Sequence, residues 1–350
     1  MILDKENIVK LLQSQDEDFY LLLKKAREEK IKTVGNMVYF RGLVEFSNNC
    51  AKDCYYCGIR KNNEKVIRYD VPEDEILDAC RFAHDRGFGS MVLQSGELSS
   101  PAFIKRVDEL LKKINKLSNG DLGITLSCGE QSREIYRRWY ESGAHRYLLR
   151  IEATNRELYY KIHPKTENHS FEKRLEALQF LRETGYQLGT GVMIGLPFQS
   201  LEDLADDLLF FKKLDIDMCG MGPYVEHENT PLYNQRHLLQ SPKERFKLAL
   251  KMIAVLRLIM PDINIASATA LEAIDPDGRR KALDAGANVV MPNLTPPDYR
   301  KEYRLYKNKP GLLEATDASL KKLKNNIESA GYQIGWNERG DSKHFTRRTQ

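Results

Sequence analysis

Three cysteines stand close together near the start of the chain and carry its most specific chemical signal. Cys50, Cys54 and Cys57 form a C-x3-C-x2-C pattern. Three thiolates can bind three of the irons of a cubane 4Fe-4S cluster and leave the last iron with open coordination positions. The pattern therefore predicts one 4Fe-4S cluster with these residues as its metal ligands.

The open iron determines what chemistry such a cluster would perform. S-adenosylmethionine can chelate this iron through its amino and carboxylate groups, which holds its sulfonium close to the cluster. An electron from the reduced cluster then breaks a carbon–sulfur bond and gives methionine and a 5′-deoxyadenosyl radical. We therefore expect S-adenosylmethionine as the second cofactor.

Two simpler interpretations of the cysteines compete with the cluster. A structural zinc site normally has four protein ligands, and the chain has no second Cys or His pair with suitable spacing. A redox-active pair of Cys54 and Cys57 would leave Cys50 unexplained. We expect the other three cysteines to be buried small residues: Cys80, Cys128 and Cys219.

Composition and charge restrict the class of protein. The chain has 350 residues, of which 41% are hydrophobic, enough for a substantial core. Lys and Arg number 54 against 50 for Asp and Glu, and the two signs alternate, so nucleic acid is not an expected partner. The N-terminus lacks the order of a signal peptide and no run is long enough to span a membrane, which favours the cytoplasm.

Short apolar strands alternate with amphipathic helices beyond the cysteines. The chain is β-rich over 34–46, directly before the cysteine segment. The later expected strands are 90–93, 123–126, 147–149, 188–194, 218–221, 263–265 and 288–291. Helices are expected to begin near Pro72, Pro101, Gln131, Phe171, Ser200 and Pro242. Eight strand and helix units result.

This order predicts an α/β fold, a closed (β/α)8 TIM-type barrel, with two Rossmann-like halves as the competing architecture. In a barrel the chemistry lies at the C-terminal ends of the strands, where the distinctive residues fall. Residues 1–32 are expected to form an N-terminal helical cap, 33–303 the barrel, and 304–350 a charged C-terminal extension that closes over or flanks it.

With the cysteines placed after the first strand, the chain resembles the radical S-adenosylmethionine (radical SAM) superfamily over nearly its whole length. Within it, the chain is most similar to the HydE-type maturases of iron-iron hydrogenase, relatives of biotin synthase and methylornithine synthase. The segments that carry the resemblance are VLQSGE (92–97), YLLRIE (147–152), GVMIGLP (191–197), GMGPY (220–224) with TPL (230–232), and AGANVVMPN (285–293).

The resemblance implies a set of cofactor-binding residues. Ser95, Gly96 and Glu97 stand where the superfamily binds the methionyl amino group. Glu152 would bind polar groups of the cofactor, and Arg174 would bind its carboxylate. The adenine would be bordered by Tyr56, Gly195 and Leu196. The alternatives are a tight turn with a solvated Glu97, a solvated helix charge at Arg174, and simple packing at Tyr56.

The resemblance also implies residues that line the reaction cavity, where an Arg and hydroxyl groups among apolar walls would hold an anionic group and protect a radical. They are Gln94, Thr125, Arg150, Thr269, Met291 and Tyr303. For each residue alone, ordinary core packing or a satisfied buried polar group is the alternative.

Two departures from the family pattern stand out. Several of these maturases carry a second cysteine set near the C-terminal end of the barrel, whereas this chain has no cysteine after Cys219, so we expect a single cluster. The family commonly has His where this chain has Ile151, and paired threonines where it has Ala268 and Thr269. These changes bear on the identity of the substrate.

By this resemblance, the expected activity is that of a radical SAM maturase in assembly of the diiron subcluster of iron-iron hydrogenase. Its substrate would be a small cysteine-bound iron carbonyl-cyanide complex, made by a second radical SAM maturase, and later steps would use a GTPase scaffold. The competing hypotheses are a radical mutase acting on an amino acid, as in methylornithine synthase, and a non-catalytic iron-sulfur scaffold protein. A zinc-stabilised structural module is a further alternative.

Overall fold

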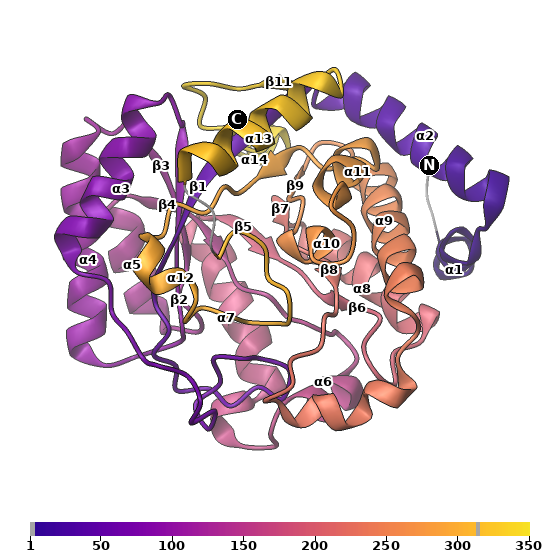
Figure 1. Cartoon of the computed structure of the whole chain (residues 1–350), viewed down its shortest axis with the longest axis horizontal. Coiled ribbons are helices and arrows are strands. Elements are labelled where there is room, and N and C mark those ends of the chain that lie inside the picture. Colours follow the sequence, from indigo (N-terminus) through magenta and orange to yellow (C-terminus); the bar gives the residue numbers. More distant parts are fainter. Residues whose placement is uncertain (1–3, 313–315) are drawn as a thin grey trace.

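The computed structural model describes residues 4–312 and 316–350. Eight parallel strands form a curled sheet at its centre (Figure 1). They are β1 (Met37–Ser47), β2 (Ser90–Ser95), β3 (Gly123–Ser127), β4 (Ala144–Leu148), β5 (Gln187–Thr190), β7 (Met218–Cys219), β9 (Asn264–Ile265) and β10 (Val289–Val290). β10 pairs with β1, and a bridge from Ala266 to Val289 joins the two ends. The predicted (β/α)8 barrel is confirmed.

Short strands lie at both ends of the barrel, and two of them form a separate small sheet. β6 (Met193–Ile194) and β8 (Gly222–Pro223) pair with each other beyond the C-terminal ends of β5 and β7. β11 (Gln333–Ile334) pairs with the start of β1, at the opposite end of the barrel. The main strands are buried almost throughout because helices cover the sheet, which explains their continuous apolar runs.

Helices surround the strands. They are α3 (Glu73–Asp85), α4 (Pro101–Leu117), α5 (Arg133–Glu141), α6 (Arg156–Ile162), α7 (Phe171–Thr184), α8 (Leu201–Leu214), α9 (Pro242–Ile259), α10 (Thr269–Glu272), α11 (Gly278–Asp284) and α12 (Pro297–Arg300), with 3-10 turns η1 (Glu167–His169) and η2 (Pro231–Leu238). Several begin at serine N-caps, and Ser200 and Ser241 complete capping boxes. The predicted starts therefore agree with the structure to within two residues.

The N-terminal helices pack on the outside of the barrel. α1 (Lys5–Gln13) and α2 (Asp16–Thr33) lie beside α8 and α9 (Figure 1). Phe19, Leu22 and Ala26 form the buried face of α2. Nζ of Lys251 in α9 donates to the carbonyl of Leu12 at 2.8 Å. These contacts attach the first helices to the face of the barrel that is remote from the cysteines.

The C-terminal residues reach both ends of the barrel. Residues 301–312 cross the C-terminal ends of the strands, whereas β11 and α14 (Lys343–Thr349) lie at their N-terminal ends, with α13 (Thr316–Ser329) between them. Residues 313–315, within the stretch where a second cysteine set would stand, lie outside the described residues. None of the described helices has the length and apolar character needed to cross a membrane.

Candidate active site

A cavity of about 240 Å³ opens at the C-terminal ends of the strands. Residues from every side of the barrel reach it, as expected for this fold. Seven of the residues predicted from the sequence line it: Tyr56, Cys57, Gln94, Arg150, Glu152, Thr269 and Met291. The same space therefore receives one of the three cysteines together with cofactor and substrate candidates.

Two further substrate candidates lie just outside this cavity. Nε2 of Gln94 donates to the hydroxyl of Tyr303 at 3.3 Å, and Tyr303 is buried behind it. Thr125 lines a smaller adjoining space of about 20 Å³, deeper in the barrel, which shares the Met291 wall. The buried Thr125 hydroxyl has no hydrogen-bond partner within the described part of the chain, so it is available to a group that enters this space.

The cysteine loop is attached to the end of β2 by its backbone. The amide of Gly96 donates to the carbonyl of Ser47 at 2.9 Å, and the amide of Glu97 lies 3.3 Å from Sγ of Cys50. A Cβ on Gly96 would stand 2.2 Å from the carbonyl oxygen of Asn49. Only glycine lets these two backbones approach so closely.

All three cysteine thiols are free and half-buried. Burial raises the pKa of Cys57 to about 12, and burial together with the neighbouring thiols raises that of Cys54. The thiols therefore stay protonated until a metal displaces their protons. Within residues 4–312 and 316–350, no three His, Cys, Asp or Glu side chains converge on one ion. A zinc site requires such convergence, whereas a cubane binds each thiolate at a different iron.

Four charged side chains lie behind the loop; Lys52 and Arg174 are buried, and Glu97 and Glu130 are mostly covered. Nζ of Lys52 is 2.9 Å from Glu97 and 2.8 Å from Glu130, and Arg174 pairs with both carboxylates. Burial raises the pKa of Glu97, and the charge of Glu130 adds to this effect. Burial opposes ionisation of Glu130 too, but Arg174 and Lys52 bring its pKa below the ordinary value. The net charge of this group is zero.

Arg150 and Glu152 follow β4 and face the cavity together. Glu152 has a left-handed backbone (φ 66°), fixed by hydrogen bonds to Gly191 and Met193. Burial raises the pKa of the Glu152 carboxyl, which lies 2.9 Å from Nη2 of Arg150. Nη2 of Arg150 also donates to the carbonyl of Val192. The irregular backbone beyond β4 thus presents one cation and one anion to the cavity.

Tyr56 and the glycine segment after β6 meet at one edge of the cavity. Leu196 is buried in a small apolar cluster against which Tyr56 packs. The amides of Gly195 and Leu196 both donate to Oε1 of Gln199, at 2.7 and 3.1 Å. Gly195 has φ 76°, and a Cβ there would meet the side chain of Arg245 at 2.6 Å. Of these residues Tyr56 lines the cavity, whereas Gly195 and Leu196 are not among the lining residues.

Sequence reasoning missed several residues that the structure brings to the site. Lys52 and Glu130 lie in loops after β1 and β3, and only their pairing with Glu97 and Arg174 shows their importance. Their position after strands was the available signal. A second buried ion pair, Glu45 with Lys309, lines the cavity wall; no local pattern relates two residues so distant in sequence.

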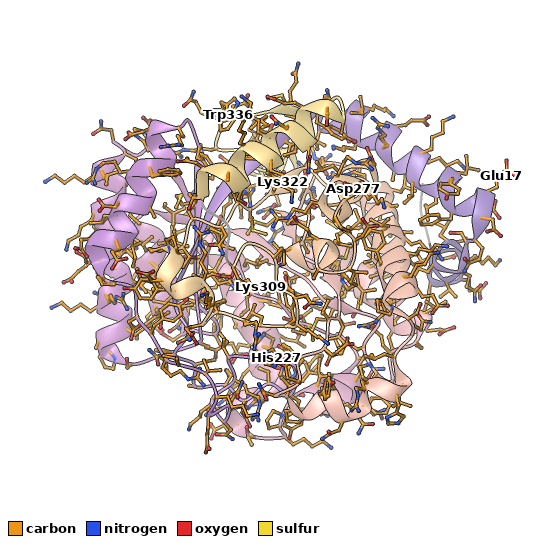
Figure 2. All side chains as sticks on the ribbon, viewed as in Figure 1. Glu17, His227, Asp277, Lys309, Lys322 and Trp336 are labelled. Carbon is orange, nitrogen blue, oxygen red and sulfur yellow. The ribbon has the colours of Figure 1, made fainter. Side chains whose placement is uncertain are left out.

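The 301–312 segment forms the outer wall of the cavity. Figure 2 shows Lys309 over the centre of the molecule and His227 near it, far from the peripheral Glu17. The amide of Gly58 donates to the carbonyl of Leu305 at 2.9 Å, and the hydroxyls of Thr269 and Tyr306 are 2.6 Å apart. The segment thus contacts both the cysteine loop and the substrate side.

Comparison with known proteins assigns the family. The profile of the radical SAM superfamily matches residues 44–211, from β1 into α8. The protein named FeFe hydrogenase maturase subunit HydE in Thermotoga maritima is 42% identical over 343 residues, which cover 97% of this chain and 94% of that protein. The chain belongs to the HydE family of radical SAM enzymes. The resemblance inferred from the motifs is confirmed.

Other relatives of this HydE-family chain share the same architecture. 3-Methylornithine synthase of Methanosarcina acetivorans is 29% identical over 94% of this chain and 92% of that protein. The crystal structure of methylornithine synthase (PylB) superposes with a TM-score of 0.81 at 26% identity, covering 96% of this chain and 95% of that one. The structure of HydG, with a TM-score of 0.78 at 21% identity over 95% of this chain and 72% of that one, shows the fold alone. Members of the superfamily use a 4Fe-4S cluster and S-adenosylmethionine.

Proposed function

We propose that this HydE-family chain is a maturase of iron-iron hydrogenase that uses one 4Fe-4S cluster held by Cys50, Cys54 and Cys57. The observation that carries the proposal is the identity of 42% along 97% of the chain with a HydE maturase. The structure adds a cavity that Cys57 shares with Arg150 and Thr269. When bound, the reduced cluster and S-adenosylmethionine supply a 5′-deoxyadenosyl radical.

The residues of this chain bind and orient the cofactor in the proposal. Glu97 binds the methionyl amino group beside Ser95 and Gly96, and Arg174 binds its carboxylate. Arg174 is buried, Glu97 is mostly covered, and both are already paired with opposite charges, which would be exchanged for the charges of the cofactor. Tyr56 and Glu152 line the remaining edge of the cavity, with Leu196 packed beside Tyr56, and the adenosyl part would fit there.

The substrate in this proposal is a small anionic iron complex. Arg150 provides a cation, while Gln94, Thr125, Thr269 and Tyr303 provide neutral polar groups and Met291 an apolar wall. Buried polar groups of this kind hold an anion without water. A cysteine-bound iron carbonyl-cyanide complex has the required charge. A second radical SAM maturase would supply it and a GTPase scaffold would receive the product, all within the cytoplasm.

The test is maturation of apo-hydrogenase in a reconstituted anaerobic system, with and without this protein. We expect hydrogenase activity only when the protein, S-adenosylmethionine and a reductant are present. Cys57→Ser should abolish it, and Arg150→Met should abolish it while S-adenosylmethionine is still cleaved. If the protein leaves maturation unchanged but converts lysine, the maturase proposal is wrong and a mutase is correct.

A further inference from the structure

His163 contacts the residue that faces the cofactor site. Its Nε2 lies 3.3 Å from the hydroxyl of Tyr56, and the two rings are perpendicular with centroids 5.3 Å apart. On its other side the imidazole stacks on Tyr159, with centroids 4.0 Å apart. His163 is only 1% exposed. It therefore stands between the helix α6 and the cysteine loop, with no direct place in the cavity.

The hydrogen bonds fix how His163 is protonated. Nδ1 is 2.9 Å from the carbonyl oxygen of Tyr159, which can only accept, so Nδ1 carries the hydrogen. Burial lowers the pKa of His163, which keeps the ring neutral. Nε2 is then an acceptor. The Tyr56 hydroxyl, 3.3 Å away, is a hydrogen-bond donor at neutral pH and donates to Nε2. A chain of two hydrogen bonds therefore runs from the Tyr56 hydroxyl through the His163 ring to the carbonyl of Tyr159.

The same region holds the cysteine loop at further points. The amide of Tyr55 donates to the carbonyl of Ile162 at 3.0 Å, and the amide of Asp53 donates to Nε2 of His169 at 2.8 Å. His169 therefore contacts the loop backbone, whereas His163 contacts a side chain. Variants of the two histidines can therefore distinguish a contact with the loop backbone from a contact with the Tyr56 side chain.

We propose that His163 is a positioning residue for S-adenosylmethionine, which holds the Tyr56 ring in the orientation that borders the cofactor. This inference rests on the proposed function, which places the adenosyl group beside Tyr56. A Tyr ring rotates about two torsions, and a fixed hydroxyl removes that freedom before the ligand binds. Without the acceptor, the buried phenol also loses its hydrogen-bond partner.

The test measures binding of S-adenosylmethionine to the anaerobically reconstituted protein by equilibrium dialysis. His163→Phe keeps an aromatic ring for stacking on Tyr159 but removes the acceptor, and we expect about tenfold weaker binding. His163→Gln places an amide oxygen near the position of Nε2 and should recover most of the affinity. His237→Gln, at an exposed position, is the matched control and should bind as wild type.

A double-mutant cycle distinguishes positioning from a general structural role. If His163 acts through Tyr56, then Tyr56→Phe and His163→Phe weaken binding similarly, and the double variant is no worse than either. Full additivity, or wild-type affinity in His163→Phe, would overturn the inference. His169→Phe should instead lower iron content per chain, because it removes the acceptor of the Asp53 amide.

A readout without cofactor accompanies the binding data. The ¹⁵N shifts of the His163 ring should show a hydrogen on Nδ1 and an accepting Nε2, and Tyr56→Phe should move the Nε2 resonance alone. Failure of the proposed function is distinct from failure of this inference. In the first case wild type does not support hydrogenase maturation; in the second, wild type supports maturation and the histidine variants bind S-adenosylmethionine as tightly as wild type.

Discussion

At the scale of single residues, four charged side chains behind the cysteine loop pair with one another, and two of them, Glu97 and Arg174, are proposed to bind the cofactor. Lys52 and Arg174 each face both Glu97 and Glu130. Burying charges is costly unless each has a partner of opposite sign. Two cations and two anions satisfy this condition, and a ligand that brings one ammonium and one carboxylate can enter without changing the net charge.

Substitution of Lys52 should lower the free energy of unfolding more than substitution of a neighbouring surface lysine. In Lys52→Met, two mostly covered carboxylates share Arg174 alone, so we expect the free energy of unfolding to fall by about 3–5 kcal/mol. Lys61→Met is the control, because Lys61 is exposed and bonds to the loop through its backbone amide. Thermal unfolding of both variants checks this. Equal midpoints would show that the Lys52 contacts contribute nothing.

At the scale of elements, β2 and the 301–312 segment hold the cysteine loop in addition to its contacts with the α6 region. β2 holds it through Gly96, and the 301–312 segment holds it through Gly58. A Cβ on Gly58 would lie 2.0 Å from the carbonyl oxygen of Arg304 and 2.7 Å from the ring of His227. Neither a backbone atom nor a buried ring can move away at low cost.

Gly58→Ala should therefore separate the loop from the 301–312 segment. We expect a loss of stability of about 1–3 kcal/mol and fewer irons per chain after reconstitution. Gly220→Ala is the matched control, because its Cβ would meet only Leu148, at 3.5 Å, an ordinary contact. Iron analysis and visible absorption measure the result. A fully loaded Gly58→Ala cluster would contradict this account of the loop.

The element α14 is attached through His344. Nε2 lies 2.7 Å from Asp215 and Nδ1 lies 3.1 Å from Asp262. Both ring nitrogens therefore donate, and the hydrogen bond to Asp262, with that to Asp215, raises the pKa of His344 although burial opposes this. The stability that charged His344 contributes is fully present below its unfolded pKa, about 6.5, and is lost as pH rises through the raised folded value.

The thermal unfolding midpoint should show this dependence. At about pH 6 the free energy of unfolding of wild type should exceed that of His344→Asn by about 1 kcal/mol, and the thermal midpoint should be higher accordingly. Both differences should shrink at about pH 9. His237→Asn, an exposed histidine, should show no such difference. The prediction fails if the gap between wild type and His344→Asn stays constant or widens with pH.

The sequence was sufficient for the order of the eight barrel strands and of the six helices expected among them, and for the residues that follow strands; it did not predict α6 or the short helices α10, α11 and α12. Period and capping signals located the strands and the starts of helices such as α4 and α9 because these are local. β4 was predicted from residue 147, yet it begins at Ala144. His145 and Arg146 concealed its start, since their polar side chains bind the C-terminal residues. Likewise, Glu45 and Lys309 meet only through the fold.

At the scale of the whole molecule, the two ends of the barrel are closed by parts of the same C-terminal region. The 301–312 segment covers the cavity, and residues 339–342 lie under the opposite end. The carbonyl of Gly340 accepts from Arg41 at 3.1 Å and from Asn264 at 2.8 Å. Asp341 pairs with the fully buried Arg146 and accepts from Gln187 at 2.7 Å. Radical chemistry requires this exclusion of water.

Asp341→Ala should weaken the contacts of residues 339–342 and make the N-terminal end of the barrel more accessible to water. Arg146 would lose its carboxylate and keep only Ser90 and the Arg339 carbonyl as acceptors, which costs about 1–3 kcal/mol. We expect faster hydrogen exchange at the N-terminal ends of β2 and β3, and more S-adenosylmethionine cleaved per product formed. Glu338→Ala, an exposed neighbour, should change neither. Unchanged exchange in Asp341→Ala would show that β11 and α14 close this end without the ion pair, because they remain attached through Gln333 and His344.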